Sequence, residues 1–117
     1  MIPLQLFLYI SGIVVLETFS QLAARFYHDN SDNRTYLFVL ACLLYIGVIF
    51  LLVKAYDFAS FAIANALWDS GTILAMALLG WLYFGEVPSR GEIVGMSLVV
   101  AGALTIGFTS DGGKKKN

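Results

Sequence analysis

A single acidic residue, Glu17, lies in the middle of the first apolar stretch of the chain. No charged residue lies between Leu4 and Glu17, and none lies between Glu17 and Arg25. A helix over this stretch, rising about 1.5 Å per residue, can cross a hydrocarbon core of about 30 Å with Glu17 near mid-depth. A carboxylate at that depth costs roughly 2.5–3.5 kcal/mol on insertion scales. We therefore expect Glu17 to have a function or a bonding partner.

The composition indicates that this chain is surrounded by lipid. It is 59% hydrophobic and 13% charged, whereas soluble domains carry about 25% charged residues. The net charge of −1 does not suggest a nucleic-acid partner. The lone cysteine, Cys42, has no nearby Cys or His with which to share a metal ion, so we expect no metal and no other cofactor.

Four apolar stretches predict four transmembrane helices. They cover residues 2–26, 36–53, 58–84 and 93–108. The polar breaks between them are short, so consecutive helices should be antiparallel neighbours. In the last break, Gly85 predicts a helix stop, and Ser89 followed by Glu92 predicts a capping box. We predict an all-α membrane protein with one four-helix domain over residues 1–110 and a flexible basic tail over 111–117.

The distribution of Lys and Arg between the two sides of the membrane is nearly even. The side with the N-terminus, Lys54 and the tail holds four of these residues, and the other side holds three: Arg25, Arg34 and Arg90. Because so weak a bias permits insertion in both directions, two inverted copies can form an antiparallel, dual-topology dimer. A fixed topology with both termini in the cytoplasm stays open.

Two of the predicted helices carry a polar stripe on one face, set by the spacing of i, i+3, i+4 and i+7. The stripes consist of Glu17, Ser20, Gln21 and Ala24 in the first helix and of Asn65, Trp68, Asp69 and Thr72 in the third. In lipid such stripes must face one another, a partner chain or a water-filled cavity. Packed together, they would form an acidic and partly aromatic chamber.

This chamber is suited to cations. The Glu17 carboxyl can bind a proton or a cation, but binding of one disfavours binding of the other. This competition couples the movement of protons to the movement of cations in the opposite direction. Trp68 offers an aromatic face worth about 0.5–2 kcal/mol to a cation. Asp69 is either a second acid of the site or a structural residue bonded to its neighbours. Tyr45 either points its hydroxyl at Glu17, faces lipid or packs within the protein. The chain shows no nucleophile–base pair and no phosphate-binding loop, so we do not expect an enzyme.

The fourth predicted helix carries Gly95 and Gly102 seven residues apart, on one face. Glycines so placed allow another helix to approach closely. The pattern predicts a dimer interface at Gly95 and Gly102, or else close packing within the chain.

These features together resemble the small multidrug resistance transporters of the wider drug/metabolite transporter superfamily. The resemblance covers residues 4–108 and rests on four segments: Leu16–Phe26, Ile63–Trp68, Gly80–Glu86 and Gly95–Ala103. It implies an antiparallel homodimer in which the acid matching Glu17 from both subunits binds protons or a cationic substrate. It also implies that the residues matching Trp68 and Tyr45 lie at the substrate chamber, and that those matching Gly95 and Gly102 form the dimer interface.

The sequence departs from the multidrug pattern at four places. Asn65 stands where a tyrosine is usual, Asp69 replaces a small polar residue, and Ser70-Gly71-Thr72 replaces a glycine-valine-glycine bend. Ala59-Ser60-Phe61 lacks the proline that is usual near the start of the third helix. The extra acid favours a more polar or more highly charged substrate than the hydrophobic drugs of the family.

We therefore predict a proton-coupled antiporter that exports a small organic cation by alternating access, as a homodimer in the plasma (inner) membrane. Alternatives are an exporter of a more polar metabolite (guanidinium or a polyamine), one half of a hetero-dimeric pair, and a membrane partner protein that transports nothing. The lysines Lys114 and Lys115 resemble a dilysine retrieval signal, which would place the protein in an endomembrane. They would otherwise be a basic end held at an anionic leaflet.

Overall fold

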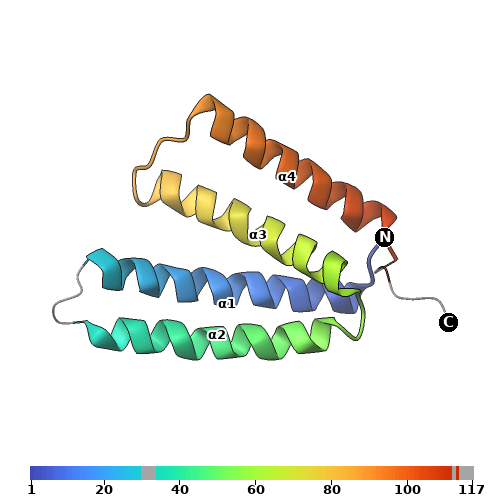
Figure 1. Ribbon diagram of the computed structural model, residues 1–117, viewed down its shortest axis with the longest axis horizontal. Helices are drawn as coiled ribbons and strands as arrows, with labels where there is room; N and C mark the ends of the chain where they lie inside the picture. Colours follow the sequence, from blue (N-terminus) through green and yellow to red (C-terminus); the bar gives the residue numbers. More distant parts are fainter. Residues whose placement is uncertain (30–33, 112, 114–117) are drawn as a thin grey trace.

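The computed structural model of the protein describes residues 1–29, 34–111 and 113. In this described part the chain forms four helices, which Figure 1 labels in order: α1 (Leu4–Asp29), α2 (Thr35–Ala55), α3 (Phe61–Leu82) and α4 (Arg90–Thr109). Each of the four is long and apolar enough to cross a membrane. The predicted all-α fold with four membrane-spanning helices is confirmed.

Helix α3 begins three residues later than the hydrophobic pattern predicts. The residues just before it form a turn, and the Ser60 hydroxyl then caps the helix by accepting a hydrogen bond from the backbone N–H of Ile63 at 3.3 Å. An N-cap of this kind satisfies one of the N–H groups that a helix leaves open at its start. The local cap, and not the onset of apolar residues, therefore sets this boundary.

The break between α3 and α4 has the predicted glycine turn and capping box. Gly85 has a φ of 70°, in the left-handed region that glycine adopts without a steric penalty. The Ser89 hydroxyl accepts from the Glu92 N–H at 3.2 Å, and the Glu92 carboxylate accepts from the Ser89 N–H at 3.1 Å. The cap starts α4 at Arg90, three residues before the predicted start at residue 93.

The core lies where α1, α2 and α3 meet. Helices α1 and α2 lie side by side along their length, and α3 crosses α1 near the α2–α3 turn (Figure 1). The largest fully buried side chains are those of Leu6, Ile13 and Val48. Trp68 of α3 belongs to the same cluster of buried residues. The three helices thus bury a common apolar interior beside the polar stripes.

Helix α4 contributes no buried residue to this core, and it neighbours α3 (Figure 1). Ile106, near its end, is partly buried and packs against the core. Near its end, the Gly107 carbonyl accepts a backbone hydrogen bond from Ile2 at 3.0 Å. Helix α4 is therefore tied to the rest of the chain mainly at its two ends.

The predicted flexible tail falls largely outside the described residues. Residues 112 and 114–117 are not described, so the retrieval signal at Lys114 and Lys115 lies outside the structural account. The polar break between α1 and α2 is likewise described only outside residues 30–33.

Candidate functional site

Glu17 lies at the interface of α1 and α3, with only 7% of its surface exposed. One carboxylate oxygen, Oε2, accepts a hydrogen bond from the indole Nε1–H of Trp68 and lies 3.4 Å from the Thr72 hydroxyl. The other oxygen, Oε1, accepts from the Gln21 side-chain amide at 2.8 Å. The acid is thus surrounded by donors from its own helix and from α3.

Helical spacing explains why these four side chains converge. Gln21 follows Glu17 by four residues on α1, and Thr72 follows Trp68 by four residues on α3. Residues four apart lie one above the other on a helix face. Two facing helices therefore bring an acid–amide pair against an indole–hydroxyl pair.

Gly71 allows α3 to come close enough for these contacts. A Cβ added at this position would lie 2.8 Å from Cγ2 of Val14 on α1, well inside van der Waals contact. Val14 can therefore pack against the backbone of α3 here because Gly71 has no side chain.

No positive side chain compensates the charge of Glu17 in the described residues. The ion pairs found there involve Arg25 and His28 with Asp29 or Glu86, all at the end of α1. Neutral donors orient a carboxylate, but they do not cancel its charge, which stays costly in a membrane interior. The site can therefore accept a proton or an external cation. The described chain shows no group of three or more His, Cys, Asp or Glu that could hold a metal ion.

Two predicted members of the site are bonded elsewhere. The Ser20 hydroxyl is buried and donates to the Ala41 carbonyl of α2 at 2.7 Å. The Asn65 amide donates to the Tyr56 hydroxyl at 3.2 Å and to the Phe61 carbonyl at 2.8 Å. Neither side chain has a described hydrogen bond with Glu17. A shared helix face brings polar groups near one another, but it does not decide which neighbour each group bonds.

Tyr45 and Asp69 have no hydrogen bond with Glu17 in the described structure. Asp69 is exposed on the surface of this single chain. Tyr45 is 38% exposed. Tyr45 also lines, together with Ser20, a groove of about 400 Å³ on the α1–α2 face. Neither residue therefore belongs to the hydrogen-bonded group around Glu17.

Gly95 and Gly102 face open space. A Cβ added at either glycine would meet nothing within 4 Å in the described structure. The close approach that these glycines permit is not used by any described part of this chain.

Gly71 was not among the residues that the sequence predicts at the site. Thr72 was predicted as part of the polar stripe of the third helix, one helical turn after Trp68, although not singled out as a binding residue. Gly71 carries no chemistry, and only its contact with Val14 reveals what it does.

Comparison with known proteins gives two matches. A family model described as Small Multidrug Resistance protein matches residues 5–99, which include α1 to α3 and the first half of α4. A curated protein named Multidrug transporter EmrE, from Escherichia coli (strain K12), is 27% identical over 104 residues. The matched segment covers 89% of this chain and 93% of that protein.

Proposed function

Because the chain belongs to the small multidrug resistance family, we propose that it is a proton-coupled antiporter that exports a small organic cation by alternating access. The observation that carries this proposal is the buried Glu17 carboxylate, which Trp68 and Gln21 orient and which no described positive side chain neutralises. Its relative EmrE is named a multidrug transporter, which supports the same class of function here.

In this mechanism, a proton and the substrate compete for Glu17. An ionised carboxylate without a counter-ion is costly at mid-membrane depth, so an empty, charged site is disfavoured. The site therefore switches its access from one side of the membrane to the other only when Glu17 is protonated or has the cation bound. Because each occupant excludes the other, the cation leaves as protons enter. Trp68 would hold the carboxylate in place and offer its ring to the cation.

We propose that the protein works as an antiparallel homodimer. The support comes from α4, which has no buried residue and presents Gly95 and Gly102 to open space. Small residues on one helix face are the usual means of close helix contact in lipid. A second copy would also cover Asp69, which no single membrane-embedded chain should leave exposed to lipid. We place this dimer in the plasma (inner) membrane.

A second candidate is export of a more polar or more highly charged cation, such as a guanidinium compound or a polyamine. The specific observation is Asp69, an exposed acid on α3 that directly follows Trp68, the donor to Glu17. Two acids close together attract a higher charge than one acid does. Asp69 would then bind the second positive group of the substrate.

The test uses purified protein in proteoliposomes with an imposed pH gradient. Proton flux is followed while quaternary ammonium, guanidinium and polyamine compounds are added in turn. We expect one class to trigger flux in the wild type, no flux in Glu17→Gln, and full flux in Asp57→Asn, the same change at an exposed acid of the α2–α3 turn. Normal flux in Glu17→Gln would refute the mechanism, and silence of a folded dimeric wild type would favour a non-transporting partner protein.

A further inference from the structure

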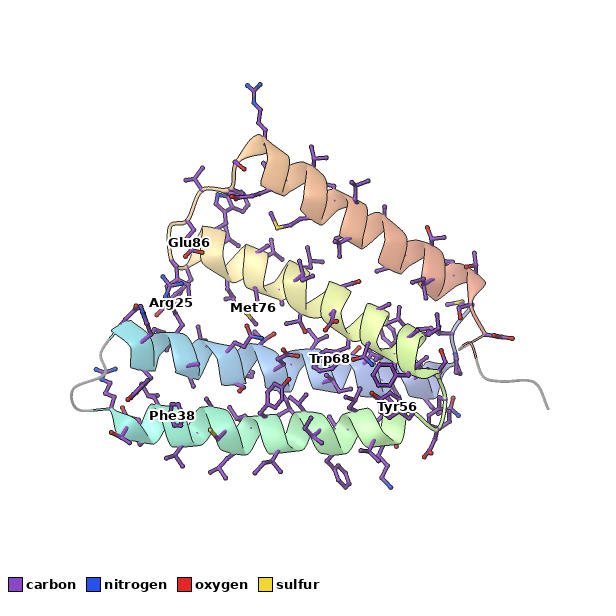
Figure 2. The ribbon with its side chains drawn as sticks, viewed as in Figure 1. Arg25, Phe38, Tyr56, Trp68, Met76 and Glu86 are labelled. Carbon is purple, nitrogen blue, oxygen red and sulfur yellow. The ribbon has the colours of Figure 1, made fainter. Side chains whose placement is uncertain are left out.

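Arg25, in the last turns of α1, bonds to the loop that follows α3. Its Nη1 lies 3.1 Å from Oε2 of Glu86, and its guanidinium lies 4.3 Å from the centre of the Phe84 ring. Figure 2 shows Arg25 and Glu86 next to one another, one from α1 and the other from the far side of the gap between α1 and α3. We refer to Arg25, Phe84 and Glu86 as the clasp.

The α3–α4 loop is shaped to present Glu86 to Arg25. The left-handed Gly85 turns the chain back, and the Glu86 N–H then donates to the Gly80 carbonyl at 2.8 Å. Gly80 is buried, and a Cβ added there would collide with the Glu86 carboxylate. Gly80→Ala would therefore displace the Glu86 carboxylate from its present place.

Aromatic contacts support the clasp from one side. The Phe26 ring lies 5.9 Å from the ring of Tyr83 and 6.0 Å from that of Phe84. Arg25 also pairs with Asp29 at 3.4 Å, but that pair is within α1 and joins no two elements. The described ion pair that joins the end of α1 to the α3–α4 loop is thus the one between Arg25 and Glu86.

The clasp lies at the end of α1 where α1 and α3 are farther apart. The two helices come together near the α2–α3 turn and diverge toward the C-terminal end of α1 (Figure 1). Arg25 follows Glu17 by two helical turns, about 12 Å along the axis. Met76, one turn after Thr72, lies in the space between α3 and α1 in Figure 2. A path from Glu17 to this membrane surface between α1 and α3 would pass Met76 and end at the clasp.

We propose that the clasp is a latch, which keeps this end of the chamber closed and separates when the chamber opens to this surface. Its ion pair suits a contact that must break in every cycle, because the side chains of Arg25 and Glu86 are 41% and 57% exposed. Exposed ion pairs contribute little and are screened by salt, so they separate readily. The role in a transport cycle rests on the proposed function, whereas the closing of the path does not.

The experiment measures access to the path with a thiol reagent. Met76→Cys is made in a Cys42→Ser background, and its labelling by a membrane-impermeant thiosulfonate is timed in proteoliposomes. We expect Arg25→Gln, which loses both the ion pair and the cation–π contact with Phe84, to speed labelling about fivefold. Glu86→Gln loses the ion pair alone and should speed labelling by a smaller factor. Asp29→Asn, which removes the pair within α1, should label at the parent rate.

The charge-swapped variant Arg25→Glu with Glu86→Arg provides the second arm. It restores an ion pair of reversed direction, so its labelling rate should return to within about twofold of the parent. Circular dichroism and size-exclusion chromatography establish that each variant is folded. Equal labelling rates in Arg25→Gln, Glu86→Gln and Asp29→Asn would overturn the latch, as would a charge swap that labels as fast as the single variants.

The labelling needs no substrate, so its outcome is separate from that of the flux measurement. Fast labelling of Arg25→Gln in a protein that moves no protons would support the latch and refute the proposed antiport. Uniform labelling in a protein that exchanges protons for cations would refute the latch alone.

Discussion

Substitution of Gly71 by alanine tests how the site is held together. The added Cβ would lie 2.8 Å from Cγ2 of Val14, about 1 Å inside the usual carbon–carbon contact distance. Overpacking of this kind costs about 1–3 kcal/mol. The cost falls if the Val14 side chain shifts or if α3 moves away from α1. Movement of α3 would lengthen the contact of Thr72 with Glu17 beyond its present 3.4 Å.

A matched control separates this clash from helix propensity. Alanine is favoured over glycine inside a helix by about 1 kcal/mol, so part of the clash is offset in Gly71→Ala. A Cβ added at Gly107, in α4, would have nothing within 4 Å. Gly107→Ala should therefore raise the free energy of unfolding by about 1 kcal/mol, with no clash to offset it. The difference between the two variants, about 1–3 kcal/mol, measures the clash.

The assay is the free energy of unfolding in mixed micelles, followed by circular dichroism during titration with sodium dodecyl sulfate. Val14→Ala removes the carbon that the new Cβ would meet. In a double-mutant cycle, the destabilisation by Gly71→Ala relative to Gly107→Ala should therefore mostly disappear when Val14→Ala is also present. The reasoning is refuted if Gly71→Ala and Gly107→Ala change stability equally, or if Val14→Ala leaves the effect of Gly71→Ala unaltered.

Four further predictions concern the site and the assembly. Trp68→Phe keeps an aromatic ring but loses the donor to Glu17, and should lower kcat/KM for exchange about tenfold in the flux assay; unchanged exchange would mean that the bond does not matter. Asp69→Asn should weaken transport of dications more than that of monocations, and equal effects on both would argue against a second binding acid. Cation binding, measured by calorimetry, should weaken as the pH falls because protons compete for Glu17, so a pH-independent affinity would contradict the shared site. Gly102→Leu should separate dimers into monomers in sedimentation equilibrium, and an intact dimer would place the interface elsewhere.

The sequence predicts the helices because each apolar stretch is long enough to cross a membrane. Polar caps at Ser60 and Ser89 move two helix starts away from the apolar boundaries. Such shifts of a few residues depend on single hydrogen bonds, which hydrophobicity does not report. The overall fold was therefore predictable, whereas the helix ends were less so.

Within the site, the sequence favours a meeting of Glu17 with the stripe of Trp68, since polar groups in lipid must find one another. It does not reveal that Ser20 bonds to α2, because a serine can bond to any carbonyl within reach. Nor does it reveal the contact between Arg25 and Glu86, which lie 61 positions apart and meet only through the shape of the α3–α4 loop. Contacts that depend on backbone geometry are not readable from residue type.

The absence of buried side chains in α4 has a consequence for how such proteins diversify. Helices α1 to α3 contain the acid, its donors and the apolar core, so the chemistry is encoded upstream of residue 90. Substitutions on α4 can then accumulate without disturbing that chemistry. After a gene duplication, changes confined to this one helix would be enough to redirect pairing from identical copies to a sister chain.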